Sequence, residues 1–292
     1  MRILHLDAGK EMRGGQWQVL RLIEGLASAG VESTLLAREG FPLFDAVRRQ
    51  GWRVEPLSLT RAVMMAHNHA VMHAHDAHGH TLGAIVRGLP LVVSRRVAFP
   101  IGSNHISSRW KYGRARHYLA VSAFVKDVLI QGGVEAEKIS VVYDGVPVLE
   151  QARGNAVLAM QKGTTLAAEA ARIARLEVKI AGDLEHDLRD AGIFVYISHS
   201  EGLGSGVLLA MSAGVPVVAS NVGGLPEVVQ HRQNGLLVEN TPEAIAGGIR
   251  ELTGDPAFAR RLAQAGRQTM TEHFTVELMV SRTLDVYRKV LA

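Results

Sequence analysis

The sequence contains no cysteine, which excludes disulfide bonds and thiolate metal ligands. It also lacks long apolar runs, since none approaches the roughly 20 residues that a membrane-spanning helix needs. The opening stretch MRILHLDAGK is too short for a signal peptide and instead predicts a first strand that runs into a glycine turn. Together these absences favour a cytoplasmic protein, either free or held at the inner surface of the membrane.

The composition is that of a globular protein, with 292 residues of which 47% are hydrophobic and 21% are charged. This length is enough for two domains of ordinary size. The formal net charge is only +4, but basic side chains are concentrated in residues 95–116, which contain no Asp or Glu. The cluster consists of Arg95, Arg96, Arg109, Lys111, Arg114 and Arg116.

Three interpretations of this basic segment stay open. It is a solvated loop, a contact for an anionic membrane surface with Trp110 and Tyr112 at the interface, or a contact for an acidic or phosphorylated acceptor. Arg95 and Arg96 close a predicted strand and point to opposite faces, so we expect at most one of them to reach a ligand. No nucleic-acid partner is expected, because the chain has no RRM, KH, zinc-finger or helix-turn-helix pattern.

Short β-rich segments alternate with helical patterns along the whole chain, which is typical of βαβ units and parallel sheets. The predicted strands of the first half cover residues 2–6, 32–36, 53–57, 71–75, 91–94, 117–121 and 139–143. Those of the second half cover residues 156–159, 177–180, 194–197, 215–219 and 235–238. The predicted helices include residues 16–29, 123–131, 165–174, 207–213, 242–252 and 256–273.

A cluster of Pro147, Gly154 and polar neighbours marks a boundary between two domains. We therefore predict the α/β fold class, with two Rossmann-like domains at residues 1–150 and 151–274 whose parallel sheets face a cleft. Residues 275–292 have the apolar spacing of an amphipathic helix.

The most informative stretch is residues 201–238, in which Glu201 precedes a small-residue loop at residues 202–206. A helix, a strand and a second glycine pair, Gly223 and Gly224, follow that loop. Loops of this kind bring backbone N–H groups and a helix N-terminus close to a phosphate. The pattern predicts a ligand site at the carboxyl ends of parallel strands.

This stretch resembles the C-terminal domain of the retaining glycosyltransferases of family 4, which have the GT-B fold. The residues that match are Glu201, Gly202, Leu203, Gly204, Ala210, Met211, Gly214, Pro216 and Val217. Shorter matches precede it in the family's order: Gly14 and Gly15 before a helix, His73 and His75 at a strand end, Ser122 with Lys126, and residues 139–146 with Asp144 at an Asn position.

The resemblance implies transfer of a hexose from a nucleotide-sugar donor to a sugar, lipid-linked or other hydroxyl acceptor, with retention and with neither metal nor cofactor. Residues 1–150 would be the acceptor domain and 151–274 the nucleotide-sugar domain, with the last helix returning to the first domain. The resemblance implies catalytic roles for Glu201 and His75. The implied donor contacts are Gly14, Gly15, Lys162, Gly202, Leu203, Gly204, Ser205 and the position of Leu209, and Arg95 and Arg96 are candidate contacts for an acceptor or a phosphate.

Three departures from the family affect the donor side. Ala156 and Val157 occupy the positions of the family's Gly and Arg, and the stretch between residues 182 and 194 is shorter than usual. Leu209 stands where the family has a second Glu, and leucine cannot accept a hydrogen bond from a ribose hydroxyl. A non-catalytic nucleotide- or sugar-binding protein with the GT-B fold is therefore the alternative interpretation.

Two further interpretations have less support. His73, Asp76, His78 and His80 are of the right types to bind zinc, but their spacing fits no common zinc motif, and we expect no metal. A nicotinamide-dependent dehydrogenase is disfavoured, because neither glycine turn has the G-x-G-x-x-G spacing with an acidic residue about 20 positions later.

Overall fold

The computed structural model describes residues 1–101, 106–160 and 163–292, with the side chains of residues 106 and 107 excepted. The chain forms two compact units. Unit 1 comprises Met1–Gly145 and Val276–Ala292, and unit 2 comprises Val146–Thr275. Each unit is a parallel sheet covered by helices, so the predicted α/β class with two Rossmann-like sheets is confirmed.

The sheet of unit 1 has seven parallel strands in the order β3-β2-β1-β4-β5-β6-β7. The strand order reverses direction between β1 and β4, and open α/β sheets bind ligands at the carboxyl ends of the strands at such a point. The strands are β1 Arg2–Leu6, β2 Glu32–Ala37, β3 Arg53–Pro56, β4 Val71–Ala74, β5 Leu91–Arg95, β6 His117–Ala120 and β7 Ile139–Val141.

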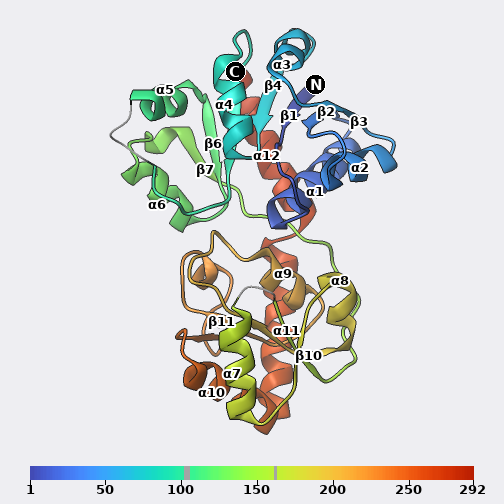
Figure 1. Cartoon of the computed structure of the whole chain (residues 1–292), viewed down its shortest axis with the longest axis vertical. Helices are drawn as coiled ribbons and strands as arrows, with labels where there is room; N and C mark the ends of the chain where they lie inside the picture. Colours follow the sequence, from blue (N-terminus) through green and yellow to red (C-terminus); the bar gives the residue numbers. More distant parts are fainter. Residues whose placement is uncertain (102–105, 161–162) are drawn as a thin grey trace. The chain divides into compact units, whose positions relative to one another are not determined.

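The last helix of the chain belongs to unit 1 (Figure 1) and packs beside α1. Its side chains Met279, Val286 and Tyr287 share one core cluster with Ile3 and Leu22. The prediction that this amphipathic helix returns to the first domain is therefore confirmed. The helices of unit 1 are α1 Gly14–Ser28, α2 Pro42–Arg49, α3 Leu59–Ala66, α4 Ala77–Ile85, α5 Ile106–Arg114, α6 Ala123–Gln131 and α12 Val276–Leu291, with a 3-10 turn at Ala136–Lys138.

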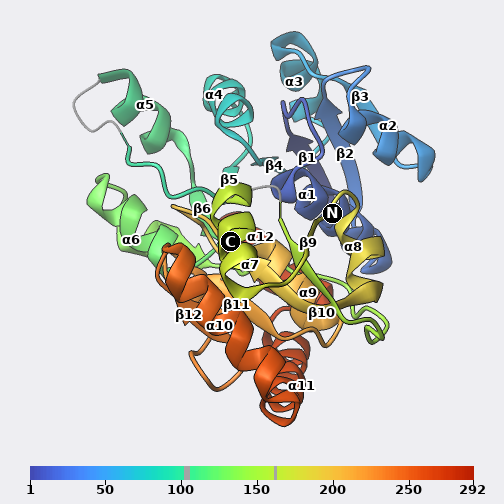
Figure 2. The same ribbon diagram turned by 60° about the horizontal axis from the view of Figure 1, so that its bottom comes forward.

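The sheet of unit 2 has five parallel strands in the order β12-β11-β10-β8-β9, and its switch point lies between β8 and β10. Alternate strand residues such as Val157, Val195 and Val218 form the core with α7 and α10, which lie side by side in Figure 2. The strands are β8 Ala156–Ala159, β9 Val178–Ile180, β10 Ala191–Tyr196, β11 Val217–Ser220 and β12 Leu236–Val238. The helices are α7 Thr164–Ala174, α8 Leu184–Asp187, α9 Ser205–Ser212, α10 Pro242–Gly254 and α11 Pro256–His273, with 3-10 turns at Leu188–Asp190 and Leu225–Glu227.

Two features differ from the sequence-based expectation. The basic segment is not simply a loop, because α5 occupies much of it, and α9 begins two residues before the predicted start at residue 207. Among the described residues, no helix combines the length and the apolar character that a membrane span requires.

Candidate functional site

The loop after β1 forms the centre of a polar cluster at the carboxyl edge of the unit 1 sheet. The Asp7 carboxylate accepts hydrogen bonds from the Gly9 backbone N–H at 2.8 Å and from the Gln16 side-chain amide at 3.2 Å. Asp76, which follows β4, accepts from the Ala8 N–H at 2.9 Å and caps α4 through the Gly79 N–H. Burial, with the Asp76 carboxylate nearby, raises the pKa of Asp7 to about 6.

The predicted glycine turn, Gly14 and Gly15, is the N-terminus of α1. No side chain caps this helix, and no acidic residue lies in its first turn. Arg96 lies alongside, since a Cβ added to Gly15 would be 3.9 Å from the Arg96 Cδ. A helix N-terminus with an adjacent guanidinium is suited to an anion.

His75 and Arg96 are linked in this cluster. The Arg96 guanidinium donates to the His75 Nδ1 at 3.4 Å and pairs with Asp144 at 3.1 Å. The other ring nitrogen of His75, Nε2, is 2.9 Å from the His5 Nδ1, and His75 is only 6% exposed. A direct contact between His75 and a substrate would therefore have to replace one of these bonds, and its catalytic role stays a prediction.

Three buried histidines, His5, His73 and His75, have ring nitrogens close enough to one another to hold a metal ion. All six ring nitrogens have protein partners already, because His73 bonds the Tyr287 hydroxyl at 2.6 Å and the Ser94 hydroxyl at 2.8 Å. Burial lowers the pKa of each of these rings, and that of His5 falls to about 3. These histidines are therefore neutral hydrogen-bonding groups at ordinary pH.

The structure does not bring the four alternative zinc ligands together. Asp76 caps α4, His78 is exposed, and the His80 ring bonds the Lys111 carbonyl at 3.2 Å. His73 instead faces Tyr287 on α12. The structure gives no support to a zinc site of these residues, because the chain turns into α4 directly after β4 and His73, Asp76 and His80 bond different partners.

In unit 2, the loop after β10 positions Glu201. The Tyr196 hydroxyl donates to the Glu201 carboxylate at 2.7 Å. Tyr196 is 5% exposed, and its ring lies against Gly206, where an added Cβ would be 3.1 Å from the Tyr196 Cε2. Tyr196 thus holds the Glu201 carboxylate in the loop between the end of β10 and the start of α9.

Two glycines shape this loop for steric reasons. Gly204, the N-cap of α9, has a φ of +97° and approaches Leu225. Gly223 has a φ of +58°, and a Cβ there would be 2.1 Å from the Glu201 carbonyl oxygen. The Gly224 N–H donates to that same carbonyl at 3.1 Å. The second glycine pair therefore fixes the backbone of Glu201.

The other predicted donor contacts divide into exposed and buried positions. Ser205 opens α9 and is partly exposed, whereas Leu203 is 2% exposed and Leu209 is 8% exposed. Gly202 is buried in the same loop. Lys162 lies outside the described residues.

Helix capping distinguishes the predicted donor positions from most of the other helices whose N-caps the structure describes. Three helices, α1, α7 and α9, have neither a side-chain N-cap nor an acidic residue in the first turn. α2 also lacks a cap, but it has Asp45 in its first turn. The capping side chains of other helices are Ser58, Asp76, Ser122, Asp183, Thr241 and Asp255. The first N–H groups of a helix need acceptors, so the N-termini of α1, α7 and α9 are suited to bind an anion.

The basic segment is partly tied into the fold. The Lys111 ammonium donates to the Ala77 carbonyl at 2.8 Å and Arg114 donates to the Ala84 carbonyl at 3.2 Å, which joins α5 to α4. Tyr112 is partly buried and stacks on Tyr118, whereas Trp110 is 46% exposed. Arg95 donates to the Phe99 carbonyl.

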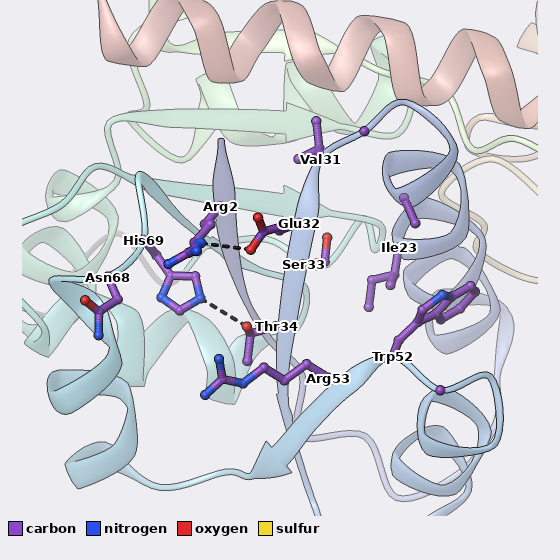
Figure 3. A pocket seen from close by; sticks show the side chains of 13 residues that line it. Arg2, Ile23, Val31, Glu32, Ser33, Thr34, Trp52, Arg53, Asn68 and His69 are labelled. Carbon is purple, nitrogen blue, oxygen red and sulfur yellow. Dashed lines mark hydrogen bonds and ion pairs between the residues drawn. The ribbon is translucent and has the colours of Figure 1, made fainter.

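A separate pocket opens at the opposite, amino edge of the unit 1 sheet (Figure 3), lined by residues of β1, β2 and β3. Arg2 pairs there with Glu32 at 2.8 Å, and the His69 ring bonds the Thr34 hydroxyl at 3.1 Å. Its charged side chains are largely exposed, and it is remote from the carboxyl edge where the predicted site residues of this unit gather.

Sequence reasoning missed His5, Asp7 and Tyr196. His5 and Tyr196 occupy strand positions whose neighbours are apolar, so the pattern predicts only core residues there. Asp7 follows a predicted strand at its carboxyl end, and this position is a signal that could have identified it.

Comparison with known proteins gives a family match in each half of the chain. Residues 12–148 match the Glycosyltransferase Family 4 domain and residues 168–269 match the domain of glycosyl transferases group 1. Over 118 residues, the chain is 40% identical to alpha-maltose-1-phosphate synthase of Mycobacterium tuberculosis, an alignment that covers 38% of this chain and 30% of that protein. Over 117 residues, it is 38% identical to glycogen synthase of the same organism, with 37% and 28% covered. The alignments thus span about 30% of the length of these relatives.

Among solved structures, HepE of Anabaena in complex with UDP and glucose has a TM-score of 0.87 at 18% identity, with 99% of each chain covered. At this identity the similarity establishes the fold, which is GT-B. The chain therefore has a GT-B fold, and it matches a glycosyltransferase domain of the family 4 type in its first half and one of the group 1 type in its second half.

Proposed function

We propose that this protein transfers a hexose from a nucleotide-sugar to a hydroxyl acceptor, with retention of configuration and without a metal ion. The main support is that the helices without a side-chain N-cap begin at or close to the predicted donor positions. α1 begins at Gly14, α9 begins at Ser205, and α7 begins two residues after Lys162 in the sequence. Each of these N-termini is suited to bind an anion such as a phosphate group of the donor.

The chemistry follows from where charge develops. The departing nucleotide diphosphate gains negative charge in the transition state, and backbone N–H groups that already point at it stabilise that charge without reorganisation. The Glu201 carboxylate, oriented by Tyr196, is suited to bind sugar hydroxyls or to stabilise the positive charge that develops on the sugar. Protein groups alone can fill these roles, and no metal is required.

UDP is the nucleotide we propose first, because the HepE structures contain UDP, UDP with glucose, or UDP-glucose. The acceptor is a sugar, a lipid-linked sugar or another hydroxyl compound, bound mainly by residues 1–150. Residues 151–274 bind the donor, and the departures at Leu209, Val157 and the short stretch after residue 182 lie in this part of the chain.

The burial of Leu209 and Val157 favours a second candidate function. Both side chains are less than 9% exposed, at 8% and 6%, so the family's polar contacts at these positions have been replaced by apolar packing. The result would be a nucleotide- or sugar-binding protein that keeps the GT-B fold without turnover.

Calorimetric titration and turnover assays with UDP and UDP-glucose distinguish the two functions. A transferase should bind both ligands, and it should either hydrolyse UDP-glucose or transfer its glucose to an acceptor. Lys162→Ala should weaken binding of both ligands, since the charge contact is shared. Glu201→Ala should spare UDP binding and depress turnover, since its contacts strengthen in the transition state. If the parent protein binds no nucleotide, including GDP, the transferase function is refuted.

We also propose that the protein works in the cytoplasm at the inner membrane surface. The exposed residues Arg109, Trp110 and Arg116 on and after α5 are the support for this. Co-sedimentation with anionic vesicles should exceed that with neutral vesicles and weaken as salt rises, because screening acts over about 10 Å at 0.1 M. Equal sedimentation with both vesicle types would refute the membrane contact.

A further inference from the structure

A continuous line of polar side chains crosses the buried interior of unit 1. The Ser33 hydroxyl lies 3.2 Å from the His5 Nε2, and the His5 Nδ1 lies 2.9 Å from the His75 Nε2. The His75 Nδ1 lies 3.4 Å from the Arg96 guanidinium, which pairs with Asp144 at 3.1 Å. The line begins on β2, passes through β1 and the end of β4, and ends beside the glycine turn of α1.

The direction of every hydrogen bond between the first and last of these groups can be deduced. A guanidinium can only donate, so the His75 Nδ1 must accept and carries no proton. A neutral imidazole has a single N–H, which places the proton of His75 on Nε2, from where it donates to the His5 Nδ1. By the same reasoning His5 carries its proton on Nε2 and donates to Ser33.

Burial supports this arrangement. His5 is fully buried and His75 is 6% exposed, so neither ring has water as an alternative partner. Desolvation lowers the pKa of both rings, which keeps them neutral with one proton each. A protonated His75 would present a second N–H to the guanidinium, and both groups would then be donors.

We propose that His5 and Ser33 are positioning residues: His5 accepts from the His75 Nε2–H and Ser33 accepts from the His5 Nε2–H, and these two bonds support the tautomer in which His75 holds Arg96 beside the uncapped N-terminus of α1. The inference rests on the proposed function only in assigning Arg96 to a phosphate or other anion. The tautomers and the position of Arg96 are properties of the protein without ligand.

Nuclear magnetic resonance tests the inference directly. In protein labelled with nitrogen-15 at histidine and arginine, long-range proton–nitrogen spectra distinguish the two neutral tautomers from each other and from the charged ring. We expect both His5 and His75 as neutral Nε2–H tautomers at pH 7. Assignment of either ring to the Nδ1–H tautomer, or to the charged form, would overturn the inference whatever the protein binds.

A variant series tests the link to Arg96. Ser33→Ala removes the acceptor of the His5 N–H, so the His75 signals should change and the Arg96 Nη1–H, which faces His75, should exchange faster with water. UDP affinity should fall about tenfold, the effect of roughly one lost hydrogen bond. Ser33→Thr, which keeps the hydroxyl, should restore these properties towards those of the parent.

Ser28→Ala is the matched control, because the Ser28 hydroxyl bonds the Glu24 carbonyl on the exposed side of α1. Its histidine and arginine spectra should equal those of the parent. If Ser33→Ala leaves the His75 and Arg96 signals unchanged, the positioning role is refuted. If the parent binds no UDP while the tautomers and the Arg96 exchange behave as expected, the proposed donor fails and the positioning role stands.

Discussion

Replacing the buried carboxylate of Asp7 by an amide should stabilise the protein at neutral pH. Asp7 is 1% exposed, and burial together with the nearby Asp76 carboxylate raises its pKa from 3.8 to about 6. In Asp7→Asn, the side-chain oxygen still accepts from the Gly9 N–H, and the Gln16 amide can turn over to accept from the new N–H₂ group. The substitution therefore removes the charge while keeping the hydrogen bonds.

The sign and size of this stabilisation follow from the pKa of Asp7 in the folded protein and in the unfolded chain. Between pH 3.8 and about 6, the folded protein keeps a proton on Asp7 that the unfolded chain has lost, so stability falls as pH rises through this range. The full loss above pH 6 is about 3 kcal/mol, at about 1.36 kcal/mol for each unit of difference in pKa. This free energy corresponds to roughly 6–12 °C in the melting temperature of a domain of this size.

The assay compares the unfolding of the parent and Asp7→Asn from pH 3.5 to 7.5. The pKa values of His5 and His80 fall from 6.5 to about 3, so protonation of the unfolded chain lowers the stability of both proteins as pH drops below 6.5. Because this effect is common to both proteins, their difference isolates Asp7. Asp285→Asn, which changes an exposed carboxylate on α12, is the control for net charge.

The unfolding free energy of Asp7→Asn minus that of the parent should be about 3 kcal/mol larger at pH 7 than at pH 3.5. About half of this increase should be complete by pH 5. A difference that does not change with pH would refute the argument, because it would mean that Asp7 ionises equally easily in the folded and unfolded states. A variant less stable than the parent at pH 7 would show that the carboxylate makes contacts that an amide cannot replace.

Three further predictions concern the loop of unit 2. Tyr196→Phe removes the hydroxyl that orients Glu201, so steady-state kinetics should show turnover reduced about tenfold with little change in the donor KM, and an unchanged turnover would contradict this role. Leu209→Glu places a carboxylate at a buried position, and denaturant unfolding should show a loss of about 3 kcal/mol, whereas tighter UDP binding without that loss would indicate a vacant ribose contact. Gly223→Ala forces a Cβ against the Glu201 carbonyl oxygen at a φ of +58°, so stability should fall by about 3 kcal/mol, and a neutral result would show that the turn can move away.

The sequence was sufficient to predict the architecture of each unit. Alternation of short apolar segments with helical periodicity predicted parallel sheets, and most strands end within a few residues of the expected positions. The N-termini of α1 and α9 could also be located approximately, because Gly14 and Gly15 open α1, and Gly204 stands at the N-cap of α9, where a capping side chain would otherwise be favoured. Such features are local, and a single sequence contains them.

Composition alone could not show which side chains of the basic segment take part in packing. Its positive charges suggested a solvated loop or an anionic partner, but Lys111 and Arg114 donate to carbonyls of α4 and so serve the packing of α5. Tyr112, expected at an interface, stacks on Tyr118. Long basic side chains can satisfy backbone acceptors while their stems cover apolar surface, and charge density alone does not separate this role from ligand binding.

The polar line through unit 1 could not be predicted for a different reason. His5 and His75 are 70 positions apart, and their contact depends on the register that pairs His5 with His73 across β1 and β4. A shift of that register by one residue would turn the histidines of one strand to the other face of the sheet. The sequence contains the groups, whereas the hydrogen-bond directions depend on their partners: Arg96 can only donate, and this one constraint determines the proton positions on His75 and then on His5. A residue's chemical role at this site is thus set by neighbours that sequence spacing does not identify, which is why Ser33 and His5 become candidates only once the sheet register is known.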